Sequence, residues 1–315
     1  MHPALSIIFF TTAAGAGYGL LLLVGLAGPL GLLPATRWLG FVLMGLSLGL
    51  IAGGLLSSTF HLGHPERAWR ALSQWRSSWL SREGVLALAT FLPAGLYAIG
   101  WVFLQSVTGL WALFGLLAAA GAVATVYATA MIYASLKTIR QWHHPLTLPV
   151  YLLMGLTSGA LFLNAVVYLF DVDYLWNDLL VILLLPIAWG LKVRYWRRID
   201  SEPSVSTPES ATGLGDWGKV RLLDPPHTEE NYLMREMGFQ VARKHSMKLR
   251  RQALIFGLTI PFVLAIIALL TSGWLATIAA VLAAASGALG VVIERWLFFA
   301  EAKHTVMLYY GRDTA

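Results

Sequence analysis

Two ionisable side chains at opposite ends of one short loop, His61 and Glu83, are the residues best placed in this chain for proton chemistry. His61 follows a long apolar run, and the Gly63 and Pro65 behind it are residue types that end helices. Glu83 stands where the next apolar run begins, and we expect Ser81 to cap that helix with Glu83 in its first turn. Both ends belong to one helical hairpin, so we expect His61 and Glu83 to lie at similar depth.

A histidine and a carboxylate at one depth suit the two-electron, two-proton chemistry of a quinone. An imidazole with a pKa near 6.5 can hydrogen-bond a quinone oxygen and exchange a proton with it. A neighbouring carboxylate can relay a proton to water. The same residue types also occur at helix ends without chemistry, because they interact favourably with the helix dipole. The pair by itself therefore predicts a quinone site without excluding a structural role.

The composition predicts a membrane protein. Hydrophobic residues make up 57% of the 315 residues, charged residues 12%, and the mean hydropathy is +0.68. A soluble domain carries about 25% charged residues, and about 20 apolar residues cross a bilayer as a helix. We predict an all-α integral membrane protein with eight transmembrane helices. The predicted spans are 5–29, 38–60, 84–105, 110–135, 146–170, 179–196, 252–272 and 274–300.

The basic residues indicate how these spans thread the membrane. With eight crossings, the two termini and the loops after spans two, four and six share one side. Every Lys and Arg except Arg37 falls on that side. Because Lys and Arg concentrate on the cytoplasmic side of membrane proteins, we expect a multi-pass protein of the bacterial inner membrane with both termini in the cytoplasm.

Three parts follow along the chain. Residues 1–196 hold the first six spans and the hairpin of His61 and Glu83, 197–251 form a cytoplasmic linker with an amphipathic helix expected from Thr228, and 252–315 hold the last two spans and a tail. The chain has no cysteine, so it cannot hold an iron–sulfur cluster through its own thiolates. We predict no metal site, and electrons would have to reach the chain through a partner.

The loop between spans two and three carries a family signature. The run His61-Leu62-Gly63-His64-Pro65-Glu66-Arg67-Ala68, followed by Leu80-Ser81-Arg82-Glu83, resembles the His-Leu-Gly-x-Pro-x-Arg-Ala and Leu-Ser-x-Glu motifs of the membrane-anchor subunits of the dimethyl sulfoxide reductase family. The segment around Tyr133 is similar to the end of that family's fourth span. His64 departs from the pattern, and the loop after span six is long. The segments 213–215 and 221–228 of that loop resemble a subgroup with candidates for sulfite–quinone oxidoreductases.

The resemblance implies a function within a complex. Such an anchor holds an iron–sulfur electron-transfer subunit and a molybdopterin catalytic subunit on the membrane and exchanges electrons with menaquinone or ubiquinone, in sulfite oxidation or in the reduction of S- or N-oxides. The chain alone is not expected to be an enzyme. The family's quinol-site histidine and glutamate match His61 and Glu83. Arg67 matches a motif position with an electrostatic role, and Tyr133 is a candidate hydrogen-bond donor beside the quinone ring.

Charge and position predict the surface that meets the partner. Arg70, Arg76 and Arg82 lie in the same loop as the motif, on the basic side. Together with the loop after span six, they form the expected docking surface for the iron–sulfur subunit.

Two other functions stay open on the sequence. A haem b needs two histidines from different helices at one depth, and His64 is one candidate ligand of a haem-binding respiratory protein. A two-haem ladder across the membrane is excluded, because no histidine lies near the opposite side. A transporter needs polar groups near the bilayer midplane. Asn164 and the Glu294-Arg295 pair are the main exceptions in nearly bare spans, and we expect that pair near the interface as an ion pair or with side chains reaching water.

Overall fold

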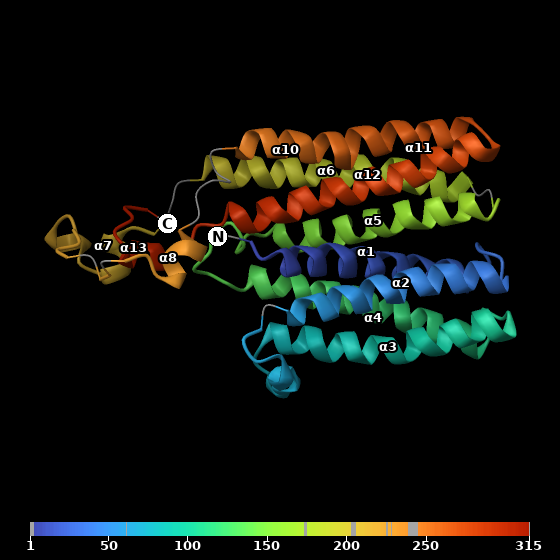
Figure 1. Cartoon of the computed structure of the whole chain (residues 1–315), viewed down its shortest axis with the longest axis horizontal. Coiled ribbons are helices and arrows are strands. Elements are labelled where there is room, and N and C mark those ends of the chain that lie inside the picture. The colour runs from blue at the N-terminus through green and yellow to red at the C-terminus, as the bar shows by residue number, and fades with distance from the viewer. Residues whose placement is uncertain are drawn as a thin grey trace.

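The computed structural model describes residues 3–60, 62–172, 175–202, 206–224, 226–227, 229–238 and 245–314. Within these ranges the chain is helical and has no strand. Eight helical segments are long and apolar enough to cross a membrane, and they lie roughly along one direction (Figure 1). The predicted all-α fold with eight spans is confirmed.

The eight spans have helix bounds close to the predicted ones, with three clear differences. The third helix begins at Trp79 instead of 84, and the sixth runs from Leu175 to Ser201 instead of 179 to 196. The seventh span begins at Ser246 instead of 252. Hydropathy marks only the apolar part of a helix, whereas its hydrogen-bonded backbone continues into the polar interface. The spans are α1 (Leu5–Ala27), α2 (Arg37–Thr59), α3 (Trp79–Leu104), α4 (Leu110–Ala134), α5 (Thr147–Leu169), α6 (Leu175–Ser201), Ser246–Leu270 and α12 (Gly273–Ala300). The span Ser246–Leu270 consists of α10 (Ser246–Leu254), the π-helical turn η3 (Ile255–Thr259) and α11 (Ile260–Leu270).

Helices α1 and α5 form the centre of the bundle. Figure 1 shows α2, α3 and α4 on one side of this pair and α6, α10, α11 and α12 on the other. The central pair packs closely because small residues face each other: a Cβ at Gly19 would overlap the carbonyl oxygen of Gly155. Without a water-driven force between helices in lipid, such close backbone packing is what holds the pair together.

The loops after the second, fourth and sixth spans and both chain ends lie at one end of the bundle, as the alternation of spans predicts. Figure 1 places α7 (Pro208–Thr212), α8 (Tyr232–Met237), α13 (Val306–Tyr309) and the two termini there. The 3-10 segment η1 (Pro65–Gln74) lies at the same end, beside the start of α3. We call this the basic end; Arg37 begins α2 at the other end.

The helix expected from Thr228 begins later in the described part of the linker. Helix α8 starts at Tyr232, because the side chain of Asn231 accepts a hydrogen bond from the backbone N–H of Met234 at 2.9 Å and caps it. Thr228 and residues 239–244 lie outside the described residues.

Candidate functional site

Glu83 is buried inside α3, close to the basic end. The helix is capped by Ser78, whose hydroxyl oxygen accepts a hydrogen bond from the N–H of Ser81 at 3.5 Å. The prediction that Ser81 is the cap is therefore wrong, and Glu83 lies beyond the first turn. The Ser81 hydroxyl instead donates to the carbonyl oxygen of Ala71, which fastens η1 to the start of α3. Because α3 begins at Trp79, Glu83 lies in the second turn of the helix and inside the bundle, where it is 4% exposed.

The Glu83 carboxylate is held by a hydroxyl from the neighbouring helix. Thr129 in α4 donates a hydrogen bond to Glu83 Oε1, and its hydroxyl also lies 3.0 Å from the carbonyl oxygen of Thr125. Burying a carboxyl group is costly unless it is hydrogen-bonded, so Thr129 is the contact that makes an acid tolerable there. The α3–α4 pair thus holds one buried carboxyl group in a fixed orientation.

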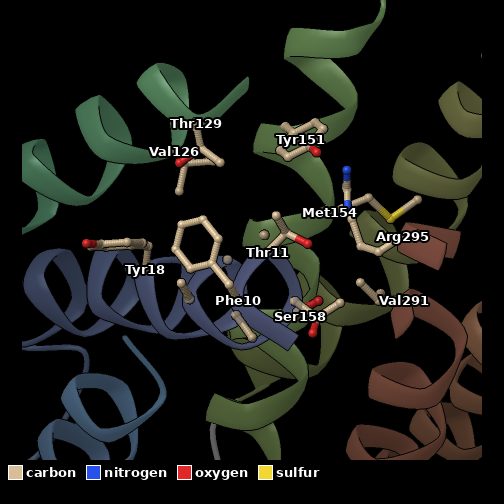
Figure 2. Close-up of a pocket in the computed structure, with 15 residues that line it drawn as sticks. Phe10, Thr11, Tyr18, Val126, Thr129, Tyr151, Met154, Ser158, Val291 and Arg295 are labelled. Atoms are coloured by element: carbon tan, nitrogen blue, oxygen red, sulfur yellow. The ribbon is translucent and has the colours of Figure 1, made fainter. Parts of the chain in front are cut away.

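The residue that holds this acid, Thr129, lines a small cavity between α1, α4, α5 and α12 (Figure 2). Its volume is about 20 Å³, enough for about one water molecule. Thr129 lines it together with Tyr18, Tyr151 and Arg295. The hydroxyls of Tyr18 and Tyr151 and the Nη1 of Arg295 are buried without a well-formed hydrogen bond in the described chain, although Tyr18 lies near Thr125 and Tyr151 near Arg295. Since buried polar groups are normally hydrogen-bonded, these groups are arranged to receive a polar atom of a water or a ligand.

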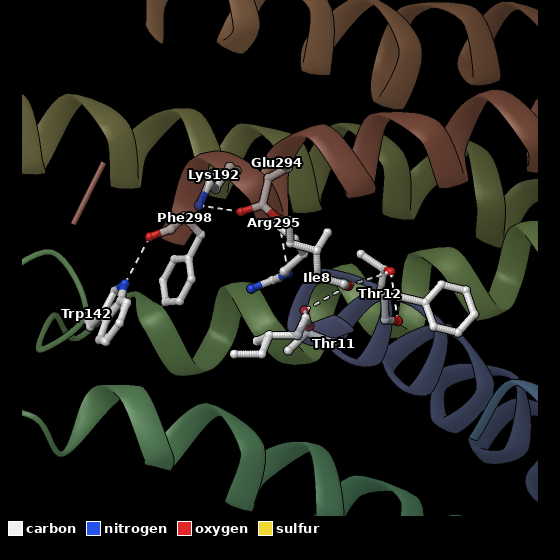
Figure 3. A network of polar contacts seen from close by, with 10 residues as sticks. Ile8, Thr11, Thr12, Trp142, Lys192, Glu294, Arg295 and Phe298 are labelled. Atoms are coloured by element: carbon white, nitrogen blue, oxygen red, sulfur yellow. Dashed lines mark hydrogen bonds and ion pairs between the residues drawn. The ribbon is translucent and has the colours of Figure 1, made fainter. Parts of the chain in front are cut away.

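Behind the cavity lies a buried triad of charges, Lys192, Glu294 and Arg295 (Figure 3). Arg295 Nε is 3.2 Å from Glu294 Oε2, and Lys192 Nζ is 2.5 Å from Glu294 Oε1. All three side chains are at most 3% exposed. Rings surround the two cations: the Arg295 Cζ lies 3.7 Å from the ring centroid of Tyr151, and Lys192 Nζ lies 4.1 Å from that of Tyr195. The triad therefore places a formal charge of about +1 next to the cavity.

The triad corrects one expectation from the sequence and supplies a residue that the sequence analysis missed. The ion pair of Glu294 and Arg295 is confirmed, but their side chains are enclosed by the bundle and do not reach water. The residue missed is Lys192, which lies inside the predicted sixth span, 179–196. A lysine within an apolar span is by default a functional residue facing the bundle interior, and that signal was available in the sequence.

Tyr133 joins the aromatic cluster around the triad. Its ring stacks on Tyr151 with 5.7 Å between centroids and meets the edges of Trp142 at 5.3 Å and Phe298 at 5.4 Å. The structure thus brings Tyr133 to the cavity-lining Tyr151. His61 lies outside the described residues, so its approach to Glu83 stays a prediction.

The remaining motif residues lie at the surface of the basic end. His64 Nδ1 and Arg67 Nε are 3.0 Å and 3.7 Å from the Glu66 carboxylate, and all three side chains are more than half exposed. The structure therefore places Arg67 on the exposed η1 segment with Glu66, away from the enclosed cavity.

The three other loop arginines divide into two kinds. Arg70 and Arg76 each lie over an exposed tryptophan, Trp69 and Trp75. Arg82 donates hydrogen bonds to the carbonyl oxygens of Trp75 at 2.9 Å and Arg76 at 2.8 Å. Arg82 therefore fixes the end of the loop, and Arg70 and Arg76 face outward.

Eight membrane-crossing helices with charges buried near one end define a multi-pass membrane protein with a polar interior on that side. The family model of the DMSO reductase anchor subunit (DmsC) matches residues 1–301. A sulfite dehydrogenase subunit of Allochromatium vinosum is similar to this chain, with 33% identity over an alignment of 335 residues that covers 98% of this chain and 99% of that protein. The chain belongs to the family of DMSO reductase anchor subunits, which confirms the resemblance of its motifs.

Proposed function

We propose that this chain is the quinone-binding membrane anchor of a molybdopterin oxidoreductase and exchanges electrons between the quinone pool and an iron–sulfur subunit docked at the basic end. The observation that carries the proposal is the buried Glu83 carboxylate, held by Thr129, which itself lines a cavity whose buried polar groups lack well-formed hydrogen bonds.

The residues around Glu83 fit the proton chemistry of a quinone, which supplies two-electron redox chemistry coupled to two protons. The cavity of about 20 Å³ has room for a water molecule that relays the proton, and not for the quinone ring itself. Glu83 takes up or delivers one proton at its carboxylate, and Thr129 fixes the orientation of that group. The imidazole of His61, from the predicted hairpin, accepts or donates the second proton. The triad behind the cavity adds a net positive charge that favours negative charge at the site. Tyr151, on which the ring of Tyr133 stacks, lines the cavity.

A partner is required because the chain has no cysteine for an iron–sulfur cluster. Arg70 on η1 and Arg76 just after it, with the described parts of the 197–251 linker, supply the exposed basic surface for this partner. The similarity to a protein of a sulfite dehydrogenase favours sulfite oxidation in the cytoplasm, with electrons running into the quinone pool. We place the complex in the bacterial inner membrane with the basic end in the cytoplasm.

The test is the substitution Glu83→Gln, which keeps the shape of the side chain and removes its exchangeable proton. We expect quinone turnover by the purified complex to fall at least about 100-fold, because positioned acid–base groups contribute 10²–10⁴ in rate. The complex should assemble normally, since a neutral amide can still accept the hydrogen bond from Thr129.

A matched control is Asp178→Asn, which neutralises another buried acid. Asp178 is 4% exposed and accepts hydrogen bonds from Asn164 at 2.8 Å and Tyr168 at 3.1 Å. It lies in the first turn of α6, at the end opposite the basic end, so turnover should be unchanged. Wild-type turnover in Glu83→Gln, or loss of assembly in that variant, would assign Glu83 a structural role.

A reduced-minus-oxidised spectrum of the same purified complex tests the cofactor assignment. We expect no b-type band from this chain. A haem band that persists in the isolated chain would reassign its histidines as haem ligands and overturn the proposed site.

A further inference from the structure

A second and larger cavity, of about 620 Å³, opens at the basic end between the α4–α5 loop and the last turns of α6. Its lining is strongly basic: Lys137, Arg140, Arg194 and Arg198, with His143 and His144 beside them. Glu202 is the only carboxylate that lines it among the described residues, and it pairs with Arg140 at 2.6 Å. The hydrogen bond from Arg140 lowers the pKa of Glu202, so this pair is charged and mutually neutralised at pH 7. The charges of Lys137, Arg194 and Arg198 are left to attract an anion.

The cavity continues into a stripe along α6 that faces outward. Arg194 and Arg198 are one helical turn apart and both exposed. Towards the middle of the span the same face carries Ile187, Leu183 and Leu179, which are 46%, 59% and 51% exposed. One face of α6 therefore changes from apolar to basic where the helix reaches the basic end.

Gly190 makes a shallow opening in this stripe between Ile187 and Arg194. It is exposed, and a Cβ added there would have no described atom of the chain within 4 Å. An acyl chain lying along α6 can therefore approach the helix backbone directly below the basic cavity.

We propose that this cavity binds the phosphate headgroup of an anionic phospholipid whose acyl chains lie along the outward stripe of α6. Basic pockets between membrane helices attract such headgroups, each Lys or Arg near the surface strengthening the interaction. Arginine in addition offers paired N–H donors to phosphate oxygens. Inorganic phosphate shares the headgroup's chemistry, but it makes no use of Leu183, Ile187 and the opening at Gly190. The continuity of the cavity with this apolar stripe is what favours a lipid.

The test uses the purified complex and native mass spectrometry, titrating phosphatidylglycerol against phosphatidylcholine with the same acyl chains. We expect preferential binding of phosphatidylglycerol and little competition from millimolar inorganic phosphate. Arg194→Gln and Arg198→Gln should each weaken the phosphatidylglycerol affinity about fivefold, from the energy of one interfacial charge. Arg251→Gln removes an exposed charge from α10, outside the cavity, and should leave this affinity unchanged.

Gly190→Phe tests the acyl-chain stripe separately from the headgroup site. The new Cβ meets no described atom within 4 Å and the side chain points outward, so the helix should stay folded, while lipid affinity falls and phosphate affinity does not. Equal binding of phosphatidylcholine, or phosphate binding as tight as that of the lipid, would overturn the proposal. Loss of the partner subunits from Arg194→Gln with unchanged lipid binding would instead make the cavity a protein-docking surface.

Discussion

At the scale of single residues, the balance of positive and negative charge decides how stable the buried triad of Lys192, Glu294 and Arg295 is. Glu294 is the one anion between two cations, Lys192 and Arg295, and all three are enclosed. Removing one partner of a buried ion pair is costly because an uncompensated charge stays in a low-dielectric environment. The three residues therefore should not be equally sensitive to substitution.

We expect Glu294→Gln to destabilise the protein by about 3–5 kcal/mol, because it leaves two buried cations side by side. Lys192→Met should cost much less, because it leaves the neutral pair of Glu294 and Arg295 in place. The double variant should be more stable than Glu294→Gln alone. Unfolding curves of the detergent-solubilised chain would measure this order, and equal losses in the two single variants would contradict it.

The candidate site could be predicted from the sequence only in part. Glu83 was found because its motif and its place at a helix start are both local features. Tyr18, Tyr151 and Arg295 lie far apart in the chain, and only the packing of α1, α5 and α12 brings them to one cavity. Lys192 was the exception, since its position inside an apolar run is visible in the sequence.

At the scale of helices, the number of spans follows from hydropathy, but their ends and their contacts do not. The start of α3 depends on Ser78 and on the bond from Ser81 to Ala71, which are polar contacts that hydropathy does not register. The central position of α1 and α5 depends on which glycines face a neighbour. Gly19 faces Gly155, whereas Gly15, one turn earlier, has no described atom within 4 Å of an added Cβ.

This difference between the two glycines predicts opposite outcomes for the same substitution. Gly19→Ala should push α1 away from α5 and cost about 1–3 kcal/mol, as overpacking does. Gly15→Ala should leave stability unchanged or raise it by up to about 1 kcal/mol, because alanine favours the helix. Thermal unfolding of both variants beside the wild type would measure the effect. Equal stabilities would mean that the α1–α5 contact is looser than the structure shows.

At the scale of the whole molecule, the asymmetry of charge divides the bundle into a basic end and an end that carries few charges. The described loops with Lys and Arg, together with both termini, lie at the basic end, and Arg37 lies at the other. Glu83, the triad and the basic cavity are also near this end. A partner subunit, the proposed quinone site and the lipid site would therefore all meet on one side of the membrane.

Because the chain has no cysteine, its orientation in the membrane can be measured by labelling single introduced cysteines. A single cysteine introduced at Ser73 on η1 or at Thr108 in the α3–α4 loop would be the only thiol in the chain, and both positions are exposed. With the basic end in the cytoplasm, a membrane-impermeant maleimide added to intact spheroplasts should label Thr108→Cys and leave Ser73→Cys unlabelled. Inside-out vesicles should give the reverse pattern for the chain expressed without its partners. Because the partner is proposed to dock over η1, co-expression should protect Ser73→Cys in those vesicles. Labelling of Ser73→Cys from outside would invert the topology and remove the proposed cytoplasmic docking of the iron–sulfur subunit.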